Sequence, residues 1–252
     1  MQTVLITGCS SGFGLETARL FLERGWRVVA TMRTPREDLL PASENLRVLA
    51  LDVTRPDSIR AAVEAAGPID VLVNNAGFGA ASPAELVPLD TVRSVFETNA
   101  VGTIALTQAV LPQFRARRAG VVVNVTSSVT IKPLPLISAY RASKAAVNAY
   151  TESLALEVEP LGVRVRLVLP GRSPETRFGD NARANITGFD HPAYAELVNT
   201  VLARMADTSG PLTYSIDVAE AVWRAATDPA TPLKIPAGKD AEAWAAELAA
   251  AR

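Results

Sequence analysis

Near its start the chain reads Thr3-Val4-Leu5-Ile6-Thr7-Gly8-Cys9-Ser10-Ser11-Gly12-Phe13-Gly14, and Leu15–Glu23 follows with helical spacing of its apolar residues. The apolar run predicts a buried strand that leads through a glycine-rich turn into a helix. Glycine permits a tight turn and a close approach of a diphosphate to the backbone. A helix N-terminus offers free N–H groups and a positive dipole to that anion. The stretch therefore predicts a strand, an anion-binding turn and a helix, with a plain strand-to-helix connection as the alternative.

Further short runs rich in β-branched residues alternate with longer helical stretches. The expected strands are Arg27–Thr31, Leu46–Leu51, Ile69–Val73, Val121–Val125 and Val163–Leu169, and the expected helices between them include Pro56–Ala66, Leu89–Arg118 and Ala139–Glu159. Strands that are apolar throughout, rather than alternating, are buried on both faces and are therefore parallel. Parallel strands joined by crossover helices predict a doubly wound, Rossmann-like α/β fold with three layers, α/β/α.

Length and composition fit one domain that spans residues 1–252. Of the 252 residues, 48% are hydrophobic, which suffices for a sizeable core, and no repeat or linker interrupts the pattern. The formal net charge is −1 with both signs interspersed, which argues against nucleic acid or a membrane surface as the main partner. Cys9 is the single cysteine, and neither a signal peptide nor a membrane span is recognisable. We therefore expect a soluble cytoplasmic protein.

The alternation of strands and helices breaks between about Arg172 and Ser215. This segment is polar, rich in Gly, Asn and Asp, and shows only one weak helical pattern, near Tyr194–Met205. A long irregular segment after a strand in a compact domain is usually functional and often a lid. We name residues 172–215 the insertion and expect it to cover a substrate.

The stretch Tyr140-Arg141-Ala142-Ser143-Lys144 contains two residues suited to acid–base chemistry. A spacing of four places the tyrosine and the lysine on one face of a helix. A phenol with a pKa of about 10 is a poor acid–base catalyst at neutral pH, and a neighbouring ammonium lowers that pKa. Such pairs are common on helices, so the interpretation depends on residues elsewhere in the chain.

Further motifs follow the predicted strands in a recognisable order. They are Asp52-Val53 after the third strand, Asn74-Asn75-Ala76-Gly77 after the fourth, Asn99 in the next helix, Ser127-Ser128 after the fifth strand, and Pro170-Gly171 after the sixth. Ser127 stands thirteen residues before Tyr140. Together with the Gly-x3-Gly-x-Gly spacing of the turn, this set resembles the short-chain dehydrogenase/reductase family over nearly the whole chain, from Thr3 to Gly238. Thr7–Gly12 and Ala30–Arg33 are most similar to the branch of hydroxysteroid and retinol dehydrogenases and bacterial carbonyl reductases.

The resemblance implies a hydride transfer between NADP(H) and a ketone, an aldehyde or a secondary alcohol as small-molecule substrate. Tyr140 would be the general acid, and Lys144 would lower the pKa of Tyr140 and bind the nicotinamide ribose. Ser127 would hold the carbonyl oxygen, with Ser128 as its rival for that role. Asn99 would hold a water molecule in a proton relay to the lysine. The alternative is a regulatory protein that binds NADP without turnover, although such relatives typically lose the tyrosine or the lysine.

The resemblance also implies which residues bind the cofactor. Members that prefer NAD carry an acidic residue at the end of the second strand, where this chain has Met32, and Arg33 follows. A guanidinium binds a phosphate through two charge-assisted hydrogen bonds and Ser11 can add another, so NADP(H) is expected, with a solvated surface arginine as the alternative. The expected cofactor-binding residues are Gly8, Ser10, Ser11, Gly12, Phe13, Gly14, Arg33, Asp52, Val53, Asn75, Ala76, Gly77, Tyr140, Lys144, Pro170 and Gly171.

Two departures from the family pattern affect the expectations. The family often has a threonine five residues after the proline of the Pro-Gly loop, where this chain has Glu175, and Thr176 comes one residue later. Ala241–Ala250 predicts a helix where some relatives pack strands across a tetramer axis, so a homodimer is favoured over a tetramer. His191 is the single histidine and lacks a ligand-spaced partner, so no metal site is expected.

Overall fold

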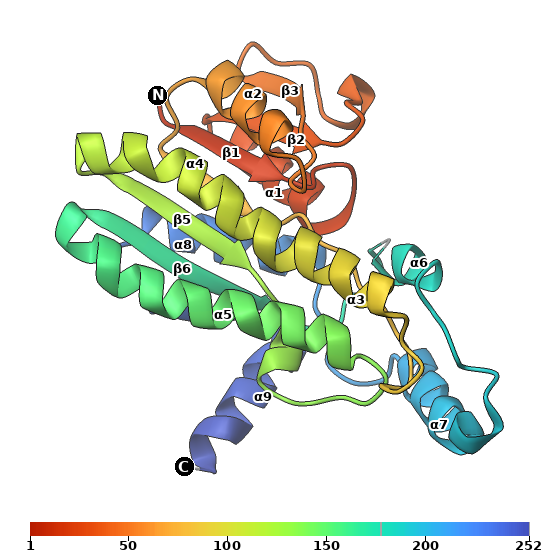
Figure 1. Ribbon diagram of the computed structural model, residues 1–252. Coiled ribbons are helices and arrows are strands. Elements are labelled where there is room, and N and C mark those ends of the chain that lie inside the picture. The colour runs from red at the N-terminus through yellow and green to blue at the C-terminus, as the bar shows by residue number, and fades with distance from the viewer. Residues whose placement is uncertain (177, 252) are drawn as a thin grey trace.

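The computed structural model describes residues 1–176 and 178–251 and shows a parallel sheet between layers of helices (Figure 1). The strands are β1 (Thr3–Thr7), β2 (Arg27–Met32), β3 (Leu46–Ala50), β4 (Val71–Asn74), β5 (Gly120–Val125), β6 (Val163–Pro170) and β7 (Lys234–Ala237). Within the described residues these seven strands form one sheet in the order β3-β2-β1-β4-β5-β6-β7, and every neighbouring pair is parallel. The prediction of a doubly wound, Rossmann-like α/β fold is confirmed.

The helices cover both faces of the sheet. They are α1 (Gly12–Glu23), α2 (Pro56–Ala66), α3 (Leu89–Phe96), α4 (Gly102–Arg117), α5 (Ser138–Val158), α6 (Phe178–Arg183), α7 (Ala195–Ala206), α8 (Ser215–Thr227) and α9 (Lys239–Ala250). In β1, Val4 and Ile6 pack with residues of α1 and α8, whereas Leu5 packs with residues of α2, α4 and α5. The central strands are mainly apolar on both faces because each face meets a layer of helices. The edge strand β3 is only partly buried.

Three elements differ from the expectations drawn from the sequence. The pattern does not predict β7, because its four residues include a proline, which is confined to edge strands and strand ends. The single helix expected over Leu89–Arg118 is divided into α3 and α4 by a π-helical segment, Glu97–Val101. The insertion contains α6 as well as the expected helix α7, and a bridge between Ala81 and Ile186 ties it to the loop after β4.

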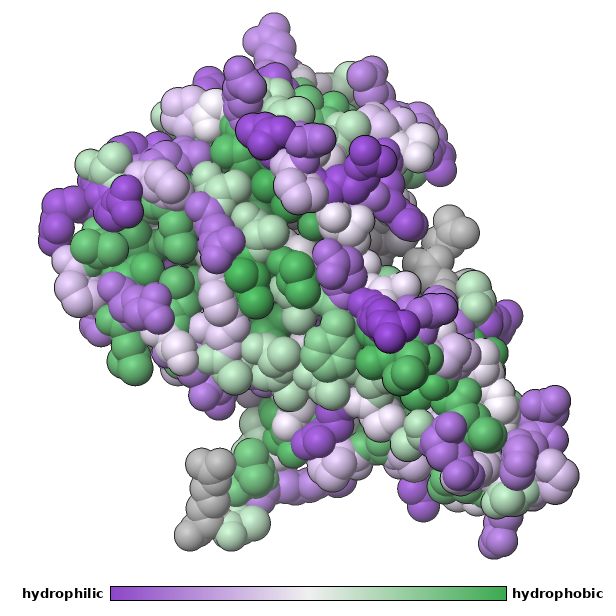
Figure 2. Space-filling model, in the orientation of Figure 1, coloured by the Kyte–Doolittle hydropathy of each residue, from purple (hydrophilic) through white to green (hydrophobic). Residues whose placement is uncertain are grey.

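The face of the molecule formed by α4 and α5 is largely apolar, and Figure 2 shows mainly green and pale green atoms over its middle. Ala142, Ala149 and Leu156 are exposed along α5, and Val101 is exposed where α4 begins. These residues do not form a membrane span, because no helix in the described part of the chain is long and apolar enough to cross a membrane.

Candidate active site

Three glycines shape the turn between β1 and α1. Gly8 (φ +74°) and Gly12 (φ +57°) have backbone angles that residues with a side chain rarely adopt, and a Cβ on Gly14 would lie 2.5 Å from the Gly8 carbonyl oxygen. The first turn of α1 has no acidic residue, and Ser11 makes no side-chain cap to the described backbone. The free N–H groups and positive end of α1 therefore face the turn. This turn offers free backbone N–H groups to an anion, and its binding of a dinucleotide diphosphate stays a prediction.

The loop after β4 is joined to this turn at the carboxyl edge of the sheet. Thr7 Oγ1 accepts hydrogen bonds from the backbone N–H groups of Asn75 and Ala76, each at 2.9 Å. Asn75 Nδ2 donates to the Thr7 carbonyl oxygen at 2.8 Å, and a Cβ on Gly8 would lie 3.0 Å from Ala76 Cα. The structure thus brings together the residues predicted from two separate motifs.

The ends of β2 and β3 lie next to the turn and carry the charged residues of this region. Met32 is buried in the core, whereas the side chain of Arg33 is exposed. Asp52 Oδ1 accepts hydrogen bonds from Thr54 Oγ1 at 2.7 Å and from Thr54 N at 3.0 Å. These bonds, together with the nearby charge of Arg33, hold the pKa of Asp52 below its usual range. Val53 packs against the N-terminus of α4.

Tyr140 and Ser127 meet at the carboxyl edge of the sheet, where α5 begins beside the end of β5. Both residues are buried, and their hydroxyls share a hydrogen bond. Ser127 Oγ also accepts a hydrogen bond from Val129 N at 3.3 Å, which caps a short 3-10 turn and fixes the serine. Of the two serines considered from the sequence, Ser127 rather than Ser128 is the one bonded to Tyr140.

Lys144 lies one helical turn along α5 from Tyr140 and is also buried. Its Nζ donates to the Val125 carbonyl oxygen at 3.1 Å, the single acceptor that the described residues supply, so it has donors left for a ligand hydroxyl. Burial lowers the pKa of Lys144 to about 8 and raises the pKa of Tyr140 to about 12, despite the hydrogen bond from Ser127. Burial therefore dominates the pKa of Tyr140, because loss of hydration destabilises the phenolate more than its neighbours stabilise it. That Lys144 lowers the pKa of Tyr140 stays a prediction.

Asn99 lies in the π-helical segment between α3 and α4, a geometry that is frequent at functional sites. Its Nδ2 donates to the Phe78 carbonyl oxygen and to Ser143 Oγ, and its Oδ1 accepts from Phe78 N, all at 3.0 Å. A Cβ on Gly77 would lie 2.9 Å from Asn99 Oδ1 and 3.2 Å from Lys144 Nζ. Asn99 therefore fixes the loop after β4 against the lysine. Its role in holding a water molecule stays a prediction, because its side-chain amide is engaged by protein groups.

The loop after Pro170-Gly171 shows how the chain accommodates its departure from the family pattern. A Cβ on Gly12 would lie 3.4 Å from Thr176 Cβ, which places Thr176 beside the glycine turn. Glu175 Oε1 instead accepts a hydrogen bond at 2.6 Å from the first backbone N–H of α8. The two residues thus have separate positions, and contact between Thr176 and a cofactor stays a prediction.

Asp240 in α9 was not among the residues predicted from the sequence. Its buried carboxylate lies so close to Gly171 that a Cβ on this glycine would collide with it. A single acidic residue on an alanine-rich helix gives no signal in the sequence, since its hydrogen-bond partners lie 68 and 27 residues away along the chain.

A tyrosine–serine–lysine group beside a turn that fits a dinucleotide defines a class, the dinucleotide-dependent oxidoreductases with a Rossmann-like fold. The family model described as short chain dehydrogenase matches residues 2–186. The chain therefore belongs to the short-chain dehydrogenase family, which uses a nicotinamide cofactor.

Two curated relatives illustrate the similarity of sequence. The 3-ketodihydrosphingosine reductase of Bacteroides thetaiotaomicron is 41% identical over 192 residues, which cover 74% of this chain and 70% of the relative. Human retinol dehydrogenase 8 is 38% identical over 181 residues, which cover 68% of this chain and 58% of the relative.

Solved structures agree with the fold and leave the choice of cofactor open. A short-chain dehydrogenase from Streptomyces avermitilis has a TM-score of 0.85 and 32% identity, over 100% of this chain and 93% of that chain. A serine dehydrogenase complexed with NADP⁺ has a TM-score of 0.81 and 27% identity, over 95% of each chain. A member from Burkholderia phymatum in complex with NAD has a TM-score of 0.82 and 25% identity, over 98% of this chain and 92% of that chain.

Proposed function

We propose that this protein transfers a hydride between NADP(H) and a ketone or aldehyde, or the corresponding alcohol. The observation that carries the proposal is the hydrogen bond between the buried hydroxyls of Tyr140 and Ser127, with the ammonium of Lys144 one turn away on the same helix. When bound, the nicotinamide supplies or accepts the hydride. A carbonyl oxygen that meets the two hydroxyls would receive hydrogen bonds from both and a proton from one.

Each of the three residues has a distinct task in carbonyl reduction. Tyr140 donates the proton, and a pKa of about 12 keeps its phenol protonated throughout the neutral range. Ser127 orients the carbonyl oxygen, because its own hydroxyl is held by Val129 N and by Tyr140. Lys144 stabilises the phenolate that remains after proton transfer, and its unused donors suit the hydroxyls of the nicotinamide ribose.

The preference for NADP(H) over NAD(H) is proposed from the charge at the end of β2. The acidic residue that would accept hydrogen bonds from an unmodified ribose is replaced by the buried Met32. The exposed Arg33 is adjacent, and its guanidinium can bind the extra phosphate of NADP(H) in a bidentate manner. The residues that line this end of the sheet therefore fit a phosphate better than a bare ribose.

We further propose that the substrate is an apolar ketone or aldehyde. Two relatives are named for molecules with a large hydrocarbon part, 3-ketodihydrosphingosine and retinol. The insertion exposes Ile186, Leu197, Leu202 and Met205, and such side chains favour an apolar molecule over a charged one. The insertion is thus proposed to act as a lid with an apolar surface.

A turnover assay over a panel of carbonyl compounds tests the proposal. We expect oxidation of NADPH with long-chain 3-ketones, retinaldehyde-like aldehydes or ketosteroids, and weak activity with short charged keto acids. Tyr140→Phe is the control, because it removes only the hydroxyl that donates the proton. Tight binding of NADPH without turnover of any member of the panel would favour the alternative, a regulatory protein that binds NADP.

A further inference from the structure

A single buried carboxylate holds both ends of the insertion. Asp240, the second residue of α9, is 6% exposed. Its Oδ2 accepts a hydrogen bond from the backbone N–H of Arg172 at 2.6 Å, and its Oδ1 accepts one from Thr213 Oγ1 at 2.6 Å. Arg172 begins the insertion and Thr213 lies two residues before its end. The two ends of a segment of more than forty residues are therefore fixed by one side chain.

The same carboxylate lies directly against the loop after β6. A Cβ on Gly171 would collide with both carboxylate oxygens of Asp240, so the backbone of this loop lies flat against the side chain. Gly171 N also donates to Thr213 Oγ1 at 3.1 Å. Since Pro170-Gly171 is the loop predicted to lie beside the nicotinamide, Asp240 fixes the backbone at that position.

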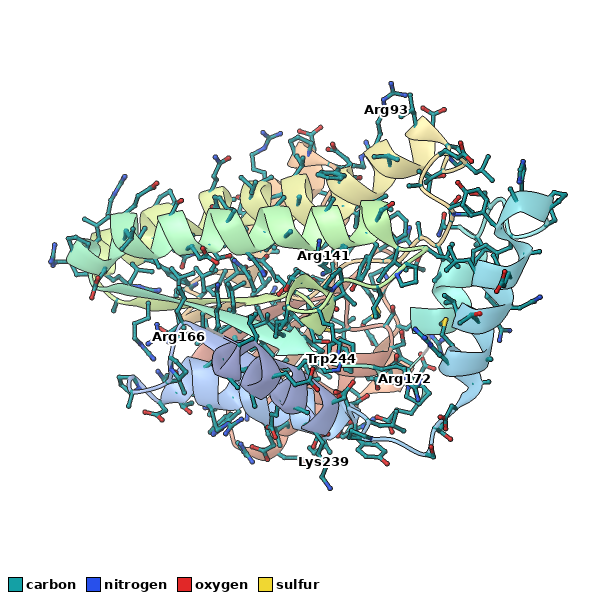
Figure 3. The ribbon with its side chains drawn as sticks, turned by 90° about the horizontal axis from the view of Figure 1, so that it is seen from below. Arg93, Arg141, Arg166, Arg172, Lys239 and Trp244 are labelled. Atoms are coloured by element: carbon teal, nitrogen blue, oxygen red, sulfur yellow. The ribbon has the colours of Figure 1, made fainter. Side chains whose placement is uncertain are left out.

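Arg172 carries the constraint from Asp240 into the insertion. Its guanidinium donates to the Arg204 carbonyl oxygen at 2.8 Å and to the Asp207 carbonyl oxygen, so it caps the C-terminal end of α7. Figure 3 shows Arg172 between α9 and the helices of the insertion. A shift of the Arg172 backbone would therefore move the C-terminal end of α7 as well.

The far part of α9 is fixed to the second loop of the active site. Lys132, four residues after Ser128, pairs with Glu247 at 2.9 Å, and its ammonium lies 5.5 Å from the centroid of the Trp244 ring. One helix therefore contacts both the loop after β5, which carries Ser127, and the loop after β6. Asp240 thus belongs to a helix that contacts the loops after both β5 and β6.

We infer that Asp240 is a positioning residue that holds the Pro170-Gly171 loop and the two ends of the insertion in the arrangement that binds the nicotinamide half of the cofactor. An ionised carboxylate accepts both hydrogen bonds, whereas an asparagine would turn an N–H₂ group toward one of the two donors. The inference rests on the proposed function in one respect, that the nicotinamide is bound at the carboxyl end of β6.

Asp240→Asn tests the inference, with Glu242→Gln as the matched control because Glu242 is exposed on the same helix. We would titrate each protein by calorimetry with NADPH and with 2′,5′-ADP, which contains the adenosine half alone. Asp240→Asn is expected to weaken NADPH binding by at least about tenfold, the effect of one lost charge-assisted hydrogen bond, and to leave 2′,5′-ADP binding unchanged. Hydrogen exchange of the ligand-free variant is expected to be faster at residues 171–176 and 207–215. Glu242→Gln should match the parent in every measurement.

Parent-like NADPH binding by Asp240→Asn, or an equal loss of affinity for NADPH and 2′,5′-ADP, would overturn the inference. Should Asp240→Asn fail to fold, Thr213→Val removes one of the two bonds to Asp240, together with the bonds of Thr213 Oγ1 to Gly171 N and to the Ala237 carbonyl oxygen, and is expected to show the same selective loss. Parent-like behaviour of Thr213→Val would then count against the inference. Binding and turnover of NADPH by the parent test the proposed function alone, whereas the ratio of variant to parent and the hydrogen exchange test the role of Asp240.

Discussion

Replacing Lys144 by methionine removes a buried charge beside Tyr140 while keeping a side chain of similar length. In alcohol oxidation Tyr140 must accept a proton, so its phenolate is the active form. Burial raises the pKa of Tyr140 to about 12, so oxidation by the parent should rise with pH across the neutral and alkaline range.

In Lys144→Met the phenolate loses the ammonium one helical turn away, so the pKa of Tyr140, which burial already raises to about 12 in the parent, is expected to rise further. Each pH unit changes the deprotonated fraction tenfold, so every unit of that rise lowers alcohol oxidation about tenfold at neutral pH. Carbonyl reduction, which uses the protonated phenol, should lose far less at neutral pH.

The assay measures kcat for alcohol oxidation across the neutral and alkaline range at saturating NADP⁺, so that weaker cofactor binding does not distort the profile. Lys144→Arg, which keeps the charge, should return the midpoint toward that of the parent. Tyr140→Phe should lower turnover by roughly 10²- to 10⁴-fold at every pH. A midpoint in Lys144→Met equal to that of the parent would refute the coupling and leave cofactor binding as the function of the lysine.

Four other perturbations test separate parts of the structure. Arg33→Ala should lower kcat/KM for NADPH by a factor equivalent to about 1.5–3 kcal/mol and should leave kcat/KM for NADH nearly unchanged. Equal losses with the two cofactors would contradict the proposed phosphate contact. Gly14→Ala should abolish binding of both cofactors in calorimetry, because its Cβ would lie 2.5 Å from Asn75 Nδ2. We propose that α5 forms a homodimer interface, so Ala149→Glu should convert a dimer to a monomer in sedimentation, and a parent that sediments as a monomer at micromolar concentration would refute this. Thermal stability of the cofactor-free protein should rise with pH between about 8 and about 10.5. In this range the folded protein has released the Lys144 proton, whereas the unfolded chain still binds it. Lys144→Met should remove this rise.

Most of the fold was predictable because its elements follow from local patterns. The central strands are covered on both faces, so their sequences are apolar without alternation, and α2 occupies the predicted Pro56–Ala66. The π-helical segment Glu97–Val101 was not predictable, because the buried residues in and just after it (Asn99, Ala100, Gly102 and Thr103) are small or polar and do not mark the change of helical phase. β7 was missed because a short strand with a proline becomes recognisable only when its neighbour β6 is in place.

The residues of the candidate site were predictable where each motif is continuous in sequence and follows a strand. The choice of Ser127 over Ser128 came from the resemblance to the family alone, because the direction of each hydroxyl depends on where β5 ends and the next turn begins. The sequence also could not predict whether the pKa of Tyr140 is raised or lowered overall. Helical spacing gives the distance to Lys144, but the burial that raises the pKa of Tyr140 arises from elements far away in the chain.

The part of the chain that matches the family model and the part that follows it are expected to have different tasks, and we expect the second part to select the substrate. The match to the family ends at residue 186, after every residue expected to bind the cofactor or transfer the proton. The remaining residues form most of the insertion, α8, β7 and α9, and the sequence places no expected cofactor-binding or proton-transferring residue among them. They act on the site through contacts such as those of Asp240 with Arg172 and Thr213. Substitutions on the exposed apolar residues of α7 should therefore change KM for the carbonyl substrate, whereas substitutions at Asp240 should change the binding of the nicotinamide.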